Sequence, residues 1–105
     1  MVAEIDELKQ FMDAIKSPYT IVDFYAQWCG PCKAIEPKLN LLSQQYPNVV
    51  FVKVDVDKPS LDSVVNACKV ASLPTFCFFI KGECVDVLVG GDITQLEARL
   101  LKMLS

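Results

Sequence analysis

The most informative part of this 105-residue sequence spans residues 22–33, which are Val22-Asp23-Phe24-Tyr25-Ala26-Gln27-Trp28-Cys29-Gly30-Pro31-Cys32-Lys33. Residues 20–26, which run into this stretch, are nearly all apolar, as expected of a central strand that is covered on both faces. Pro31 is favoured in the first turn of a helix, where its missing N–H costs nothing, so a helix is expected to begin there. Cys29 and Cys32 therefore lie where a buried strand leads into a helix.

This position favours redox chemistry at the two cysteines. Cys29 falls just before the helix and Cys32 within its first turn, so free N–H groups and the positive end of the helix dipole face the first sulfur. Such sites favour the reactive thiolate and have pKa values of about 3.5 to 7.5, against about 8.5 for a free cysteine. Two cysteines at this spacing can also form a disulfide with little backbone movement.

Two other interpretations of the Cys-x-x-Cys motif are weaker. A structural zinc site needs four Cys or His ligands, but the chain has no His, and Cys68, Cys77 and Cys84 are not spaced as a second pair. No metal is expected. A purely structural disulfide is rare in a reducing compartment. The absence of His also excludes a Cys-His catalytic pair.

The composition excludes several other classes of protein. The 10 Lys and Arg against 13 Asp and Glu give a net charge of −3 without a basic run, so nucleic-acid binding is not expected. The length and the 52% hydrophobic content predict one domain over residues 1–105. The acidic N-terminus is unlike a signal peptide, and no apolar stretch is long enough to span a bilayer. We expect a cytoplasmic protein that does not interact with membranes.

Hydrophobic periodicity predicts alternating helices and strands. The expected helices cover residues 5–15, about 31–46 with a kink at Pro37, about 59–68, and 92–104 with Asp92 as N-cap. Asp6 and Glu7 are expected in the first turn of the first helix. The expected strands cover residues 20–26, 49–56, 75–80 and 83–89, and the last two form a hairpin with a turn at Lys81-Gly82. This order predicts a small α/β sandwich around a mixed sheet.

The sequence resembles the thioredoxin family over the whole chain. The resemblance rests on the highly specific motif Trp28-Cys29-Gly30-Pro31-Cys32 and on three further segments, Lys53-Val54-Asp55-Val56-Asp57, Leu73-Pro74-Thr75-Phe76 and Val89-Gly90. It implies a three-layer sandwich in which four helices flank a mixed five-stranded sheet.

Asp23 is a carboxylate within an apolar strand, where Asp is disfavoured. Burial would raise its pKa and suit it to accept a proton, although an Asp at a strand end could instead reach solvent. The resemblance implies that Asp23 lies beneath the dithiol and assists deprotonation of Cys32. It also implies that the Lys53 ammonium approaches Asp23 and tunes it, whereas the alternative is an ordinary lysine on a polar face.

The resemblance also implies roles for the residues around the dithiol. Cys29 would be the nucleophile and Cys32 the resolving thiol, with Gly30 and Pro31 shaping the site between them. Pro74 would be cis and stacked against the dithiol. Leu73 and Thr75 would bind substrate, with the backbone at Leu73 accepting a substrate strand through β-type hydrogen bonds. Trp28 would form a lip over the site, although core packing is the alternative. Gly30 and Gly90 fit close approach of a partner backbone, although Gly90-Gly91 could simply be a turn before the last helix.

The remaining cysteines are weaker signals. Cys68 shares an apolar helical stripe, which favours buried packing, although some animal-type thioredoxins carry regulatory cysteines near this position. Cys77 and Cys84 would share a face of the hairpin as a diagonal pair about 7–8 Å apart. That exceeds the usual disulfide reach of about 6.8 Å, so both are expected to be structural.

The implied function is reduction of disulfides in client proteins by the Cys29–Cys32 dithiol. No G-x-G-x-x-G motif is present, so no bound nucleotide or flavin is expected. The resemblance implies that NADPH supplies electrons through thioredoxin reductase, with peroxiredoxins, ribonucleotide reductase or methionine sulfoxide reductase as clients of a monomer. One alternative is an oxidase or isomerase of the same fold, although Gly30-Pro31 favours the reducing end and isomerases resemble C-G-H-C. The other is a non-catalytic binding module.

Overall fold

Five strands form one mixed sheet in the spatial order β1-β3-β2-β4-β5. The strands are β1 (Ala3–Glu4), β2 (Thr20–Tyr25), β3 (Val50–Asp55), β4 (Thr75–Ile80) and β5 (Glu83–Val89). The pairs β1–β3 and β3–β2 are parallel, whereas β4 runs antiparallel to both β2 and β5. The computed structural model describes all residues from 1 to 105.

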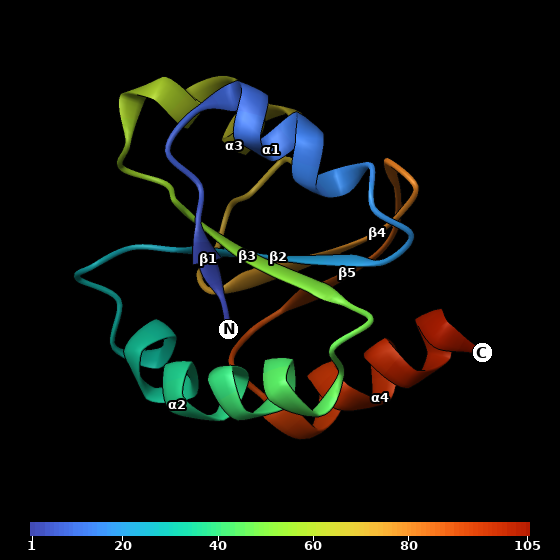
Figure 1. Cartoon of the computed structure of the whole chain (residues 1–105). Coiled ribbons are helices and arrows are strands. Elements are labelled where there is room, and N and C mark those ends of the chain that lie inside the picture. The colour runs from blue at the N-terminus through green and yellow to red at the C-terminus, as the bar shows by residue number, and fades with distance from the viewer.

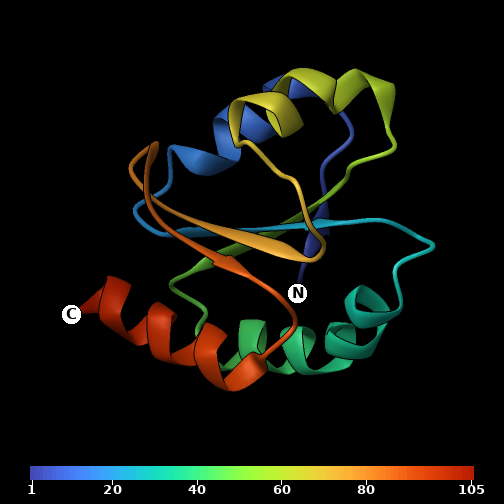
Figure 2. The ribbon, with the colours of Figure 1, turned by 180° about the vertical axis from the view of Figure 1, so that it is seen from behind.

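Helices cover both faces of the sheet (Figures 1 and 2). The helices α1 (Leu8–Ile15) and α3 (Asp62–Ala67) lie on one face, and a short 3₁₀ turn over Pro59–Leu61 precedes α3. The helices α2 (Gly30–Gln45) and α4 (Ile93–Leu104) lie on the other face. The expected three-layer sandwich with a mixed five-stranded sheet and four helices is confirmed. None of the helices is both long and apolar enough to cross a bilayer.

The alternation of side chains along β2 builds two hydrophobic cores. Ile21 faces α2 and α4 and belongs to the larger core, whereas Val22 and Phe24 belong to the core beneath α1 and α3. Asp23 and Tyr25 share the face of Ile21 because successive strand residues point to opposite sides. The carboxylate of Asp23 therefore lies on the α2 side of the sheet.

The first helix begins three residues later than expected. Ile5 is buried but not helical, because its N–H donates to the Lys53 carbonyl and extends the pairing of β1 with β3. The side chain of Gln10 accepts hydrogen bonds from the N–H groups of Asp6 and Glu7 and caps the start of α1. The prediction that Asp6 and Glu7 lie in the first helical turn was therefore wrong.

The hairpin and the last helix follow the prediction closely. Lys81 and Gly82 both have positive φ, 49° and 89°, as expected of a two-residue hairpin turn. A bulge between Phe78 and Phe79, which the pattern did not predict, shifts the β4–β5 register. Asp92 caps α4 by accepting hydrogen bonds from two backbone N–H groups of its first turn. The second predicted helix also forms, and it continues beyond Pro37 to Gln45.

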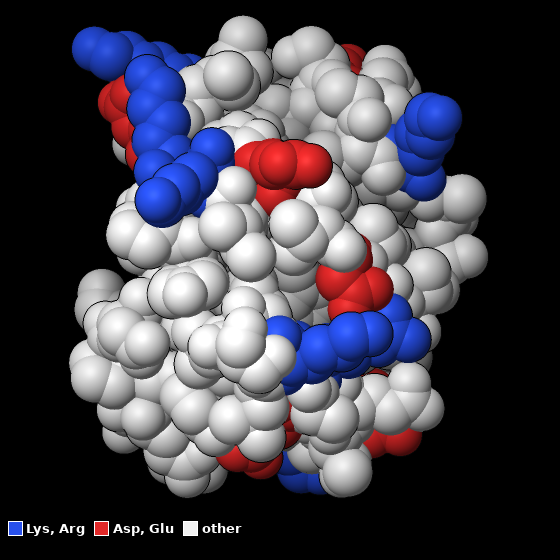
Figure 3. All heavy atoms as spheres, turned by 90° about the vertical axis from the view of Figure 1, so that its right-hand side faces the viewer, with Lys and Arg blue, Asp and Glu red and all other residues white.

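Charged side chains are dispersed over the face that carries the β4–β5 turn and the C-terminal end of α4. Figure 3 shows this face as mostly uncharged surface, on which basic side chains stand in separate groups beside acidic ones. Arg99 illustrates such a pair, because its guanidinium lies 2.9 Å from the Asp86 carboxylate.

Candidate active site

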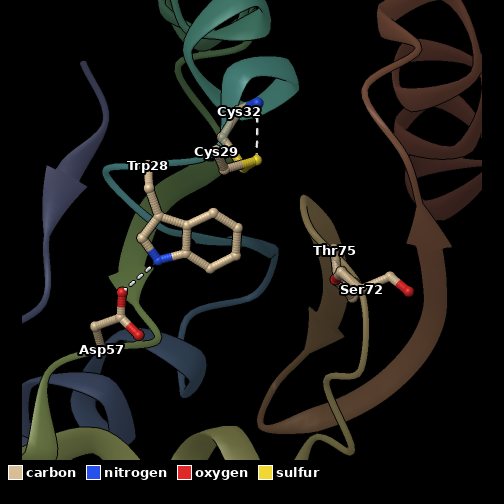
Figure 4. Close-up of a disulfide and its surroundings, with 6 residues drawn as sticks. All are labelled: Trp28, Cys29, Cys32, Asp57, Ser72 and Thr75. Carbon is tan, nitrogen blue, oxygen red and sulfur yellow. Dashed lines mark hydrogen bonds between the residues drawn. A yellow bond between two sulfur atoms is a disulfide. The ribbon is translucent and has the colours of Figure 1, made fainter.

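Cys29 and Cys32 form a disulfide at the N-terminus of α2, with their Cα atoms 5.3 Å apart. Cys29 is the N-cap residue, and its Sγ accepts a hydrogen bond from the Cys32 N–H over 3.3 Å (Figure 4). Pro31 occupies the first helical turn. A backbone N–H at the start of the helix therefore donates to the Cys29 sulfur. This arrangement stabilises a thiolate there once the disulfide is reduced.

Asp23 is buried on the α2 side of the sheet, where it lines a cavity together with Cys32. Its side chain is 5% exposed, and its Oδ1 has no hydrogen-bond partner, so the alternative of an Asp that reaches solvent was wrong. Burial raises the pKa of Asp23 from 3.8 to about 7. A cavity of about 120 Å³ is lined by both Asp23 and Cys32. The carboxylate thus titrates near neutral pH and shares a cavity with the second cysteine.

Lys53 lies directly opposite Asp23 in the β2–β3 register, but its ammonium forms its ion pairs with other carboxylates. Its Nζ lies 3.8 Å from Glu4 and 3.7 Å from Glu36, and 5.1 Å from the centre of the Tyr25 ring. No ion pair within 4.0 Å joins Lys53 to Asp23. The lysine still lowers the pKa of Asp23 through space, against the larger effect of burial.

A groove of about 550 Å³ runs beside the disulfide. It is lined by Trp28, Cys29, Gly30 and Pro31 of the active-site loop, and by residues from other parts of the chain: Val56, Val65, Val70, Ala71, Ser72 and Leu73. Trp28 is 71% exposed and therefore does not pack in the core. Its indole Nε1 donates a hydrogen bond to Asp57 over 2.8 Å (Figure 4). Cys29 thus borders a mostly apolar groove, and the hydrogen-bonded Trp28 indole forms one of its walls.

The loop before β4 lies across from Trp28, as Figure 4 shows for Ser72 and Thr75. The Leu73–Pro74 peptide bond is cis, the isomer that the resemblance implies. Leu73 lines the groove. Thr75 is buried, and its hydroxyl donates to the Ser72 carbonyl over 2.6 Å. Thr75 therefore holds this loop in shape rather than lining the groove.

The two adjacent glycines before α4 differ in what surrounds them. Gly90 has a φ of 109°, and its N–H donates to the Pro74 carbonyl over 2.8 Å. A Cβ built on Gly91 would lie 3.5 Å from the Pro31 carbonyl and 3.8 Å from the Pro74 ring, whereas one on Gly90 or Gly30 would meet nothing within 4 Å. Gly91 is thus the glycine packed against the active-site loops, a role that the sequence reasoning missed.

Three further residues of the site were not identified from the sequence. They are Glu4, Glu36 and Asp57, which contact Lys53 or Trp28. Surface carboxylates are common, and no local pattern distinguishes these three. Only Asp57 could have been found from the sequence, because it follows the carboxyl end of a predicted strand, and the dithiol was expected at the carboxyl end of another.

The other three cysteines are free. Cys77 is buried in the core beneath α1 and α3, and the half-buried Cys68 packs against the same core. Interaction with Cys68, together with burial, raises the pKa of the Cys77 thiol. Cys84 is exposed, so the expectation that it packs was wrong. No group of three or more Cys, Asp or Glu side chains lies close enough to hold a metal ion.

Comparisons with known proteins agree with this geometry. The family model described as Thioredoxin matches residues 2–102. Thioredoxin of Equus caballus is 44% identical over 103 residues, which cover 95% of this chain and 96% of the horse protein. The solved structure of Plasmodium falciparum thioredoxin has a TM-score of 0.90 and 36% identity, over 96% of this chain and 98% of that one.

A second solved structure comes from work on the thiol resolving mechanism in yeast mitochondrial 1-Cys peroxiredoxin via glutathione/thioredoxin systems. Its matching chain has a TM-score of 0.89 and 35% identity, over 96% of this chain and 94% of that one. The family model and both solved structures match almost the full length of the chain, and the chain carries a cysteine pair that can form a disulfide. The chain therefore belongs to the thioredoxin family, and it acts as a thiol-disulfide oxidoreductase that reduces protein disulfides.

Proposed function

We propose that Cys29 attacks the client disulfide, that Cys32 resolves the resulting mixed disulfide, and that Asp23 accepts the proton of Cys32. The observation that carries this assignment is the position of the two sulfurs. Cys29 lines the apolar groove, whereas Cys32 lines the small cavity that it shares with Asp23. The thiol that a client reaches first is therefore Cys29, and the thiol next to a base is Cys32.

The proposed reaction consists of two exchanges. The Cys29 thiolate attacks one client sulfur, which breaks the client S–S bond, forms a Cys29–client disulfide and releases the other client sulfur as a thiolate. The Asp23 carboxylate then takes the proton of the Cys32 thiol. The resulting Cys32 thiolate attacks Cys29 Sγ, releases the second client thiolate and forms the Cys29–Cys32 disulfide. Two electrons have passed from the dithiol to the client.

The pKa of Asp23 suits this proton transfer. With a pKa of about 7, a large fraction of the carboxyl groups is ionised near neutral pH, and the ionised form is a stronger base than an ordinary carboxylate. General bases are most effective when their pKa lies near the working pH. Lys53 tunes this group by lowering the pKa that burial raises.

The groove is proposed to hold an extended segment of the client. Trp28 forms one wall, and the backbone at Leu73, next to the cis-proline, offers β-type hydrogen bonds to the segment. Valine side chains line much of the rest of the groove, which favours clients with apolar residues around the disulfide. Gly30 leaves open space beside the dithiol, and Thr75 and Gly90 support the proline loop through hydrogen bonds.

Electrons are proposed to come from NADPH through thioredoxin reductase, as family membership implies. Peroxiredoxins are proposed as clients, supported by the yeast structure described above. Ribonucleotide reductase and methionine sulfoxide reductase are further clients that the family implies. We propose a monomer in the cytoplasm, where the free thiols of Cys68, Cys77 and Cys84 would remain reduced.

The test is NADPH-coupled reduction of insulin disulfides with thioredoxin reductase. Wild type should turn over, and both Cys29→Ser and Cys32→Ser should abolish turnover. Only Cys32→Ser should accumulate mixed disulfides with client proteins, since it keeps the attacking thiol and loses the resolving one. Trapping by Cys29→Ser instead would reverse the two roles. Absence of turnover by wild type would favour a binding module.

A further inference from the structure

Three charged side chains form a row across the neighbouring strands β1, β3 and β2. Glu4 of β1 pairs in register with Lys53 of β3, and Lys53 pairs in register with Asp23 of β2. Neighbouring strands lie about 4.8 Å apart, and side chains in register point to the same face. Lys53 therefore stands between two carboxylates, one exposed at the sheet edge and one buried beside Cys32.

The ammonium of Lys53 lies with the outer carboxylates. It forms ion pairs with Glu4 of the row and with Glu36, which α2 holds above the row, at 3.8 and 3.7 Å. Tyr25 fixes this arrangement, because its hydroxyl donates to the Glu4 carboxylate at 2.7 to 2.8 Å and its ring lies beneath the ammonium. The Lys53 ammonium is thus paired with Glu4 and Glu36 and not with Asp23.

Asp23 consequently has no cation paired with it. Its Oδ1 is buried without a partner, and the cavity beside it is lined by Cys32, Glu36 and Lys53. A lysine that moved into contact would stabilise the ionised carboxylate and weaken it as a base. The charges already act in this sense, because Lys53 lowers the pKa of Asp23 while Glu36 and Glu4 raise it.

We propose that Glu4 and Glu36 are positioning residues of the reaction: they hold the Lys53 ammonium off the Asp23 carboxylate, which stays free to receive the proton of Cys32. This inference rests on the proposed role of Asp23. The step it controls is one proton transfer, from the Cys32 thiol to an Asp23 oxygen, with no change in electron count. The groups that face Asp23 are Lys53 from β3, Glu4 from β1, Glu36 and Cys32 from α2, and the neutral Tyr25 hydroxyl.

The test is a cycle of variants that separates positioning from simple loss of charge. Its members are wild type, Glu4→Gln/Glu36→Gln, Lys53→Gln, and the triple variant. Two quantities are measured, the titration midpoint of the Asp23 carboxyl carbon by NMR in the oxidised protein, and the pH profile of single-turnover insulin reduction. Glu83→Gln, at an exposed carboxylate by the β4–β5 turn, is the matched control, and Glu36→Gln alone serves if the double variant folds poorly.

In the double variant the released Lys53 should pair with Asp23 and lower its midpoint by roughly one pH unit. The acid limb of the rate profile should move in the same direction. Most of that shift should disappear when Lys53 is also replaced, because no ammonium remains to reposition. A shift of equal size with and without Lys53 would overturn the inference, since the two glutamates would then act only through their own charge.

Failure of the underlying function is distinguishable from this result. If Asp23→Asn leaves the pH profile of reduction unchanged, Asp23 is not the proton acceptor, and the positioning of Lys53 has no catalytic consequence. If Asp23→Asn removes the titration from the profile and the variant cycle shows no dependence on Lys53, the proton acceptor stands and only the positioning role fails.

Discussion

The indole Nε1 of Trp28 donates a 2.8 Å hydrogen bond to the carboxylate of Asp57, just beyond the end of β3. This bond joins the loop that carries Cys29 to the segment that follows β3. An exposed tryptophan would otherwise sample several rotamers, and ordering it on client binding would cost free energy. The bond therefore prepares one wall of the client groove.

We expect Asp57→Ala to raise KM for a protein client without a matching fall in kcat, because the loss of one wall restraint weakens binding. The increase should be at most about tenfold, equivalent to about 1.4 kcal/mol. Asp57→Asn keeps an acceptor oxygen and should stay near wild type. Steady-state insulin reduction measures both constants, and tryptophan fluorescence anisotropy checks the mobility of the indole. An equal loss in both variants would point to the charge rather than the bond.

Asp23→Asn should stabilise the oxidised protein at alkaline pH. Because the native pKa of about 7 lies above the usual 3.8, the native state between these values holds a proton that the unfolded state has lost. The free energy of unfolding therefore falls as pH rises through this window and is level above about 7. The gain from Asn at pH 8 should be large, up to about 4 kcal/mol.

Urea unfolding of the oxidised protein at pH 4, 6 and 8 measures this effect. The variant should lack most of the decline that wild type shows, while Asp13→Asn, at an exposed carboxylate of α1, should retain it. Parallel declines in wild type and Asp23→Asn would contradict the raised pKa.

The adjacent glycines should respond differently to alanine. Gly90→Ala places a Cβ at a φ of 109° and should cost about 1–3 kcal/mol of stability. Gly91→Ala adds a methyl group at ordinary contact distance from Pro31 and Pro74 and should cost less than about 0.5 kcal/mol. Chemical denaturation compares the two variants. A larger cost at Gly91 would mean that the loops around the disulfide cannot accommodate the added atom.

The free thiols should react with a maleimide in order of exposure. Cys84 is exposed, whereas Cys77 is 1% exposed, and interaction with Cys68, together with burial, raises the pKa of Cys77. In the oxidised protein Cys84 should be labelled first, and Cys77 only after unfolding. Peptide mass spectrometry over time gives the order, with Cys84→Ser as the control. Early labelling of Cys77 would show that β4 opens readily.

Much of the fold follows from local pattern. The hairpin strands, the capped final helix and the helix that begins beside Cys29 appear at their predicted positions, because turn and capping chemistry act between residues close in sequence. The start of α1 does not lie at its predicted position, because Ile5 pairs with Lys53, nearly fifty residues away. Periodicity could not distinguish a buried residue that extends a sheet from one that begins a helix.

The reactive dithiol and its family could be identified from the amino-acid sequence alone, because Trp28-Cys29-Gly30-Pro31-Cys32 is a continuous motif at a helix start. The sequence also marked Asp23 as an unusual carboxylate in an apolar strand. Three features required the folded structure: the ion pairs of Lys53, the packing of Gly91 on the proline loop, and the hydrogen bond from Trp28 to Asp57. These contacts join residues distant in the chain, and their energies depend on burial and direction, which arise only when the strands and helices pack together.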